Sequence, residues 1–478
     1  MISLKPLHSE IKPKNPKRNV SGLRVHNRRL NLLNALVVTT ALVGCGQSPE
    51  DIATMRIVID EQIMTDTQDS AASETAPLPF EQFEAALFAA VSENELYRAA
   101  LATELAAKAQ VNVASSGKRP QISSSVNAGL IQDMSSDNDD VETGAIAGVN
   151  LSQLIYDGGE TTADINRANA EVLIAEAERM VRGNDVASQA SQAWVDVWKH
   201  QSRAELLTSR LSKLNELVGQ VERMAANGMV DRSVLDSAMR ERLEFGMADL
   251  DIQADLQDAE LRFQRLFNTP PARLQLPANV VTAPAIRAAA SAPRQAPELQ
   301  RSAAELIVAR SAVAMAEAGF EPRIRLQAGV RSPVDLQDDV NGSLGVVMEY
   351  VIGDGGRRQS QLESATAQMQ RAEAQFTAAK QALETELNIS IARLDAIERT
   401  MPVVTQREAL AAARIETLQS QLATGQTGLG QLIDAEIQLY RVRDQVITMR
   451  AEREILFLTI GARLGLLARQ IGLLDADS

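Results

Sequence analysis

Cysteine, histidine and aromatic residues are scarce in this sequence. Its 478 residues include one cysteine, three histidines and 3% aromatic residues. One cysteine excludes an internal disulfide and a zinc site built from several cysteines. Two of the histidines precede Cys45, and His200 alone cannot supply the base, nucleophile or second ligand that catalysis or metal binding requires. We therefore expect no catalytic residues, no metal site and no cofactor.

The sequence also lacks the short motifs of the common hydrolases and nucleotide-binding enzymes. It has no Gly-x-Ser-x-Gly, no His-Glu-x-x-His, no cysteine–histidine pair and no phosphate loop. A periplasmic hydrolase is thus disfavoured, and we predict that the protein is not an enzyme.

Clustered positive charge is missing outside the amino-terminal segment. The formal net charge is −14, and residues 1–44 hold eight of the 48 basic residues but one of the 62 acidic residues. The remainder therefore has 40 basic and 61 acidic residues, a net charge of −21. Because nucleic-acid binding needs a clustered basic surface, we expect no nucleic-acid partner.

The amino terminus resembles a bacterial lipoprotein signal. A basic segment ending at Arg29 precedes a modestly apolar run at 30–43, which ends at Leu42-Val43-Gly44-Cys45. The resemblance implies that residues 1–44 are removed and Cys45 is lipidated, and Gly46 after the cysteine directs the anchor to the outer membrane; a plain signal peptide is the alternative. Beyond Cys45 no stretch approaches the roughly 20 apolar residues of a membrane-spanning helix, which excludes an inner-membrane transporter.

Two copies of one pattern follow. Tyr156-Asp157-Gly158-Gly159 is echoed by Gly353-Asp354-Gly355-Gly356, and the turn at Gly228 by that at Gly425, both at an offset of 197 residues. Such a shared offset indicates a duplication. The predicted organisation is a tether at 45–78, a first repeat at 79–268, a linker at 269–297, a second repeat at 298–467 and a tail at 468–478. The linker carries six prolines and is expected to be extended.

Each repeat is expected to contain one helix, two strands and two long helices. In the first repeat, helix is expected from Leu87 to Val113; strand-like alternation then surrounds Val126 and Val149, with a polar, acidic loop at 132–144 between the strands. The second repeat has a helix from Glu298 to Gly319, alternation around Ile324–Val330 and Leu344–Tyr350, and a loop at 335–342. Four such strands leave two unpaired edges, so strands that lie in a membrane must be completed by other subunits.

The longest helices are predicted over 160–226 and 357–423. Each would span about 100 Å at 1.5 Å per residue, which suits a duct rather than a compact domain. Apolar and small residues recur in the second at the spacing of a coiled-coil seam: Leu362, Ala365, Met369, Ala372, Phe376, Ala379 and Leu383. Pro402 should kink this helix or divide it in two.

The lipoprotein signal, the duplicated order of elements, the Asp-Gly-Gly strand exits and the glycine turns together resemble the TolC family of outer-membrane efflux and secretion channels. The resemblance covers nearly all of 79–467 and implies a mainly α fold with a small β part. Long antiparallel helices would form a helical barrel, and four strands per chain would contribute to a twelve-stranded outer-membrane β-barrel in a homotrimer. Gly158, Gly159, Gly355 and Gly356 would form the strand-to-helix turns.

The resemblance also implies partners and a gate. A periplasmic adaptor protein would dock at the helix turns at Gly228 and Gly425, and an inner-membrane pump would supply the cargo. Asp434 and Gln431 fall at positions where the family narrows the periplasmic entrance with acidic residues, although Gln431 is not an acid. An ordinary solvated acid is the alternative for Asp434.

The expected function is passive conduction of cargo from the pump to the exterior, across the outer membrane. The lipoprotein signal favours small toxic compounds as cargo, whereas Tyr156-Asp157-Gly158-Gly159 favours a secreted polypeptide of a type I system. The alternative function is a coiled-coil lipoprotein that tethers envelope layers without a pore. Alternating strands separated by acidic loops disfavour such a tether.

Overall fold

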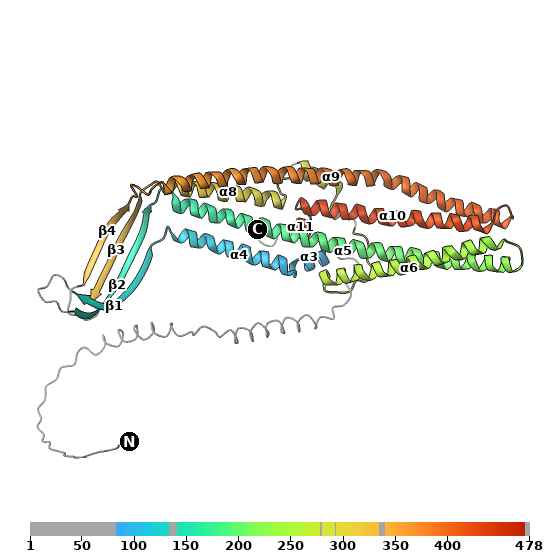
Figure 1. The fold of residues 1–478 in the computed structure, drawn as a ribbon, viewed down its shortest axis with the longest axis horizontal. Coiled ribbons are helices and arrows are strands. Elements are labelled where there is room, and N and C mark those ends of the chain that lie inside the picture. The colour runs from blue at the N-terminus through green and yellow to red at the C-terminus, as the bar shows by residue number, and fades with distance from the viewer. Residues whose placement is uncertain (1–82, 133–140, 278–279, 292, 334–339, 474–478) are drawn as a thin grey trace, which may run out of the picture. The chain divides into compact units, whose positions relative to one another are not determined.

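The structure is a computed structural model that describes residues 83–132, 141–277, 280–291, 293–333 and 340–473. The chain divides into Met1–Ser73 and Glu74–Ser478, and every described residue belongs to the second unit. This unit is a long bundle of helices with a four-stranded sheet at one end (Figure 1). None of the described helices combines the length and the apolar character that crossing a bilayer requires. The predictions for residues 1–82, including the lipidation of Cys45 and the tether, concern residues outside the described ranges.

The described helices follow the order expected for two repeats. The first repeat consists of α3 (Phe83–Ser92), α4 (Glu95–Ser116), β1 (Gln121–Gln132), β2 (Val141–Tyr156), α5 (Glu160–Ala226) and α6 (Arg232–Phe267). The second consists of α8 (Pro297–Ala318), β3 (Arg323–Pro333), β4 (Asn341–Glu349), α9 (Arg357–Ala423), α10 (Leu429–Arg463) and α11 (Leu466–Gln470), with α7 (Ala283–Ser291) between the two repeats. The helices α5 and α9 have 67 residues each, and both have the predicted bounds.

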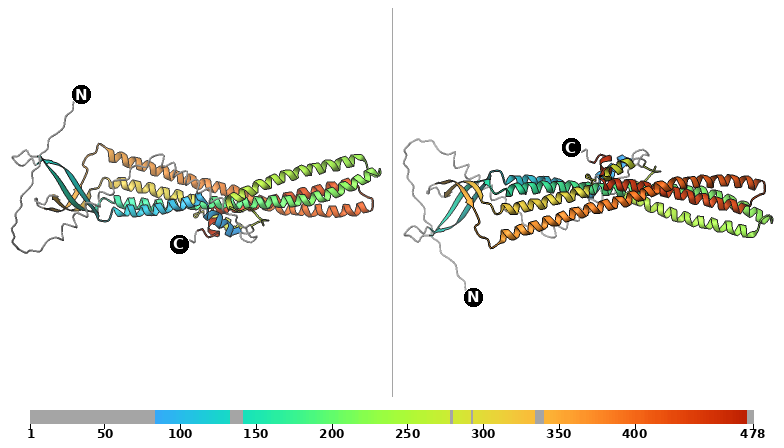
Figure 2. Two further views of the ribbon diagram at one scale, coloured as in Figure 1. Left: turned by 90° about the horizontal axis from the view of Figure 1, so that it is seen from below. Right: turned by 90° about the horizontal axis from the view of Figure 1, so that it is seen from above.

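The long helices pack side by side, in one row of four near the sheet and another row of four near the helix tips. Nearest the sheet, α5 packs against α4 and α8, and α8 packs against α9. At the other end, α5 packs against α6 and α10, and α10 packs against α9 (Figure 2). Packing of α5 against α8 near the sheet and against α10 near the tips therefore joins the two repeats, while α4, α6 and α9 lie at the edges.

The sheet has the strand order β1-β2-β3-β4, and all neighbours are antiparallel. Pairing of β2 with β3 joins the repeats, and a register shift between Leu154 and Tyr156 lets β2 turn into α5. The loops are shorter than predicted, because Gln132 and Val141–Gly144 belong to strands, as do Asn341 and Gly342. Tyr350 lies beyond the end of β4.

Three other expectations differ from the structure. The helix predicted over 87–113 is two helices, because the side chain of Asn94 accepts a hydrogen bond from Leu96 N at 2.9 Å and starts α4 anew. The linker 269–297 is not wholly extended, since it contains α7. Division of the helix at Pro402 was wrong, because α9 continues through Pro402 as one helix, and next to it Val404 is buried against Val442 and Val446 of α10.

The main core lies in the middle of the bundle, around Trp194 of α5. The ring of Phe83 packs edge-on against it at 5.2 Å, Phe263 and Phe267 of α6 lie at 5.8 and 5.9 Å, and the indole Nε1 donates to Gln275 O at 2.8 Å. The scarce aromatic residues are thus concentrated where α3, α5 and α6 meet. A separate apolar cluster joins α5, α6 and α10 toward the helix tips.

The Asp-Gly-Gly sequences close the two strand-to-helix turns. The carboxylate of Asp157 accepts hydrogen bonds from Gly159 N at 3.0 Å and Thr161 N at 2.8 Å, and Gly158 and Gly159 have φ values of 66° and 92°. In the second repeat Asp354 accepts from Gly356 N and Arg358 N, both at 3.1 Å. Glycine is required because each turn needs two consecutive left-handed residues, which side chains with a Cβ resist.

Gly158 carries a second constraint that Gly159 lacks. A Cβ at Gly158 would overlap the Cβ of Glu321, which lies between α8 and β3 of the second repeat, whereas a Cβ at Gly159 would meet open space. We expect Gly159→Ala to destabilise the fold by about 1–2 kcal/mol through its backbone alone, and Gly158→Ala to cost clearly more. Thermal unfolding followed by circular dichroism measures both. Equal losses would contradict the proposed packing of the two repeats at this turn.

Candidate functional site

The helix tips lie at the end of the bundle opposite the sheet (Figure 1). Gly228 ends α5 and Gly425 ends α9, with φ values of 71° and 72°, so both reversals use the same left-handed residue. Asp231 then begins α6, because its carboxylate accepts a hydrogen bond from Ser233 N at 2.8 Å. Met229, 62% exposed, lies between these two caps. The two turns are therefore short, rigid and open to contact.

Gln431 and Asp434 lie one turn apart on the exposed side of α10, near its start. This side continues as a polar stripe through Gln438, Arg441 and Gln445. The Thr427 hydroxyl and the Gln431 amide oxygen are 2.6 Å apart, which ties the turn to the helix. Asp434 has no ion-pair partner among the described residues, so its carboxylate is available to a group outside this chain.

A buried ion pair lies directly behind this stripe. Arg210 Nη1 of α5 donates to Glu436 Oε2 of α10 at 2.8 Å, and the two residues are 4% and 7% exposed. Arg210 Nη2 also donates to Ile433 O at 3.5 Å, and the guanidinium lies over the ring of Phe245 of α6 at 5.8 Å. Arg210 therefore fixes the beginning of α10 against α5 and α6, next to Asp434.

Two further ion pairs extend this connection along α10. Arg203 of α5 donates to Asp444 at 2.7 Å, and Arg443 donates to Glu408 of α9 at 3.1 Å. Sequence reasoning missed all three pairs. The available signal was that Arg210 falls between Leu207 and Leu214 on the buried stripe of α5, where a charged residue needs a partner.

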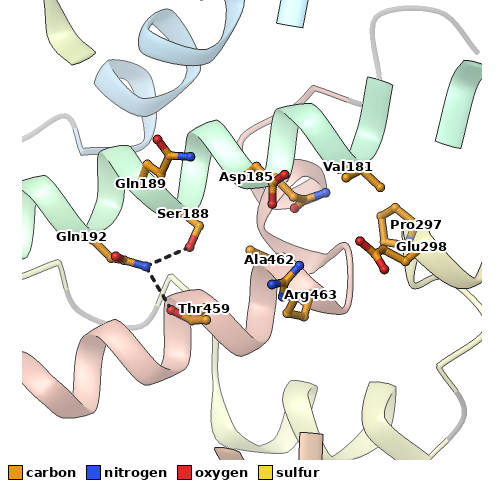
Figure 3. A pocket seen from close by; sticks show the side chains of 11 residues that line it. Val181, Asp185, Ser188, Gln189, Gln192, Pro297, Glu298, Thr459, Ala462 and Arg463 are labelled. Carbon is orange, nitrogen blue, oxygen red and sulfur yellow. Dashed lines mark hydrogen bonds between the residues drawn. The ribbon is translucent and has the colours of Figure 1, made fainter. Parts of the chain in front are cut away.

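A pocket of about 170 Å³ lies in the wall of the bundle between α5, α8 and α10 (Figure 3). Asp185, Glu298 and Arg463 bring charges of both signs to it, and burial raises the pKa of Asp185, although Arg463 opposes this. Gln192 donates to Ser188 Oγ at 3.3 Å and to Thr459 Oγ1 at 3.5 Å. An amide cannot take a proton from either hydroxyl, so the pocket provides no activated nucleophile.

The described ranges contain one histidine, His200, and it lies apart from this pocket. His200 lies within 3.8 Å of Asp255, and burial lowers the pKa of its imidazole, so it is neutral at pH 7. In the described part of the chain no three His, Cys, Asp or Glu side chains are placed to hold a metal ion. The features that stand out are therefore the two-faced sheet, the helix tips and the ion pairs behind Asp434.

Comparison with known proteins agrees with this architecture. Residues 289–466 match the family described as outer membrane efflux protein. The chain is 24% identical over 384 residues to the outer membrane efflux protein BepC of Brucella suis, covering 76% of this chain and 81% of that protein. The solved structure of CusC, a transmembrane channel, has a TM-score of 0.70 at 15% identity and covers 83% of this chain and 95% of its own. The outer membrane protein VceC of Vibrio cholerae has a TM-score of 0.70 at 18% identity, with coverages of 80% and 96%.

Removing one partner of the buried ion pair should destabilise the tip of the bundle. We expect Glu436→Gln to cost about 3–5 kcal/mol, because it leaves Arg210 charged and buried without a carboxylate. Glu205 of α5 pairs with Arg273 in the segment after α6, but both side chains are more than half exposed, so Glu205→Gln should cost under about 1 kcal/mol. Urea unfolding measures both variants. A similar small effect for both would show that Arg210 does not depend on Glu436.

Glu454 of α10 makes stability depend on pH. Burial raises its pKa to about 7, although Arg453 opposes this, and the residue is 4% exposed. The folded state thus holds the Glu454 proton more tightly than the unfolded state, so the contribution of this group to stability is greatest below about pH 4.5 and is lost as the pH rises through 7. Glu454→Gln should therefore stabilise the protein by up to about 3 kcal/mol at pH 8 and by little at pH 5. The difference in melting temperature between the two pH values tests this, and an equal shift at both would contradict it.

Proposed function

We propose that this chain, a member of the TolC family of outer-membrane efflux proteins, forms the outer-membrane duct of a tripartite efflux or type I secretion system. It lies in the outer membrane and extends into the periplasm. Cargo delivered by an inner-membrane pump and a periplasmic adaptor passes through it without chemistry by the chain. The observation that carries the proposal is a sheet with two unpaired edges and with exposed apolar side chains such as Val149, Val330 and Leu344 on one face, continuous with helices about 100 Å long.

The sheet supports assembly of several copies. β1 and β4 are edge strands, and each presents a row of unpaired main-chain groups. In a bilayer those groups need partners, because hydrocarbon offers no hydrogen bonds. Pairing of β4 with β1 of a second copy supplies them, and repetition closes a barrel. Three copies, the number that the family resemblance implies, give twelve strands.

The helices support the same assembly. Exposed apolar side chains lie along the edge helices, with no described partner: Leu96, Leu105 and Val113 on α4; Leu243, Met247 and Leu250 on α6; Ile389, Val403 and Leu410 on α9. The three residues on α9 are separated by multiples of seven, so they form one seam. Packing of α9 against α4 and α6 of the next copy would cover both sets.

The second strand-to-helix turn lacks a neighbour that the first turn has. Gly158 packs against Glu321, where the first repeat meets the second within the chain. Its counterpart Gly355 meets open space. The second turn is thus built like the first but lacks its neighbour, and a second copy would provide one.

The helix tips fit docking and gating. The turns at Gly228 and Gly425 are the candidate contacts for the adaptor, and Asp434 with Gln431 is the candidate gate. In a closed ring the polar stripe of α10 would face the lumen. Three copies of Asp434 would then lie near one another at the periplasmic entrance, held in place by the ion pair of Arg210 with Glu436.

A structural tether without a pore is the second candidate. Such a protein could use the long helices and a lipid anchor at Cys45. It has no need for a sheet whose large apolar side chains are exposed on one face, so the sheet favours the duct.

Purified protein in detergent tests the proposal through its mass and its conductance in a planar bilayer. We expect a trimer that forms discrete channels. Asp434→Ala should increase the conductance, because it removes the side chains that narrow the entrance. Asp236→Ala is the matched control, since Asp236 occupies the corresponding place on α6 and is exposed. A monomer or dimer without conductance would eliminate the duct and leave the tether.

A further inference from the structure

The strand register sorts the side chains of the sheet into two chemically different faces. One face carries large apolar residues that are 51–76% exposed: Ile122, Val126, Val149, Val330, Leu344 and Val346. Cross-strand partners lie on the same face, and Val149 is paired with Val330 while Leu344 is paired with Ala328. This face suits contact with lipid.

The opposite face is mainly polar. A Cβ on Gly148 would lie 3.5 Å from Arg331 Cγ and 3.6 Å from Ser125 Oγ, which places these two side chains on one face. Ser343 Oγ and Asn150 Oδ1 approach Gly329 on the same side. In a closed barrel with the apolar face toward lipid, this face lines the lumen.

Charge on the polar face is mostly of one sign. Its three basic residues are Arg323, Arg325 and Arg331, which share one face of β3 because even numbers of positions separate them. Among the residues whose side chains are described, its one acidic residue is Glu349 of β4. Arg323 forms an ion pair with Glu160. Neither Arg325 nor Arg331 has a carboxylate partner in the described ranges, so their charge is not neutralised there.

The two unpaired arginines lie in different surroundings. Arg325 lines a hollow at the base of the sheet together with Asp157, Glu160 and Asp164, so the net charge there is mixed. Arg331 lies six residues further along β3, about 20 Å away at 3.3 Å per residue. Its cross-strand partners are Gly148 and Asn341, which carry no charge. Positive charge is therefore least compensated around Arg331.

We propose that Arg331, assisted by Arg325, makes the exit segment of the duct favour anions. The inference rests on the proposed function, because the polar face becomes a lumen only when the barrel closes. Three copies of each residue would form two positive rings, beyond an entrance that carries Asp434. Solutes with carboxylate, phosphate or sulfonate groups are drawn into the exit segment, and cations are held back by the same rings.

Ionic strength sets where the effect can be measured. The Debye length is about 30 Å at 0.01 M salt and about 3 Å at 1 M. Charges on the wall therefore influence ions across a wide lumen in dilute salt alone. Because Asp434 acts in series with the arginines, the informative quantity is the change that a variant causes, rather than the absolute preference of the channel.

The experiment measures the reversal potential of the full-length protein in planar bilayers across a dilute KCl gradient. Wild type is compared with Arg331→Gln, with Arg325→Gln/Arg331→Gln, and with the charge-preserving control Arg331→Lys. We expect the chloride-to-potassium permeability ratio to fall roughly twofold or more in Arg331→Gln near 0.01 M salt, and further in the double variant. Arg331→Lys should match wild type, and the differences should vanish near 1 M salt.

Two results would overturn the inference while leaving the duct intact. One is an unchanged reversal potential in the double variant, measured on channels of normal conductance. The other is an equal shift in Arg331→Lys and Arg331→Gln, which would indicate a change of shape rather than of charge. Wild-type protein that forms no channels and is monomeric in detergent would instead remove the proposed function itself.

Discussion

The main-chain hydrogen bonds between β2 and β3 are the constraint on which the rest of the structure depends. They hold the two repeats side by side, and the same register places α5 next to α8 below the sheet. The elements on either side of this junction have neighbours on one side alone among the described residues. β1 and β4 have no outer strand, and α4, α6 and α9 keep apolar side chains exposed. One internal junction thus serves as the pattern for the junctions between copies, and the proposed trimer repeats it.

Much of the fold could be predicted because it is periodic. The common offset of 197 residues, the heptads of α9 and the alternation around Val126 and Leu344 predicted the long helices and the strands, and residues 289–466 match the family described as outer membrane efflux protein. The failures have local causes. A single capping side chain, Asn94, divides a helix, and α9 continues through Pro402, next to which Val404 packs against Val442 and Val446 of α10. Neither effect is visible in a hydrophobic pattern.

Less of the candidate site than of the fold could be predicted from the sequence. Glycines of the turns could be found because a left-handed residue has a sequence signature, but their roles, like that of Asp434, remain predictions. Arg210 and Glu436 are 226 residues apart, and their pairing depends on which faces of α5 and α10 meet. The arginines of β3 are unremarkable until the strand register shows that they share a face with polar neighbours. Tertiary contacts decided these features, so a single sequence could not reveal them.

The equal lengths of α5 and α9 set the distance from the sheet to the two helix tips. Each helix advances 1.5 Å per residue, so deleting one heptad from α9 alone would preserve its seam but raise its tip by about 10 Å relative to that of α5. The hairpin turns at the two tips would then no longer lie in one plane. A change in length that keeps the two tips level therefore requires equal changes in α5 and α9, and matching changes in α6 and α10. The distance between the sheet and the tips is thus set by both repeats together.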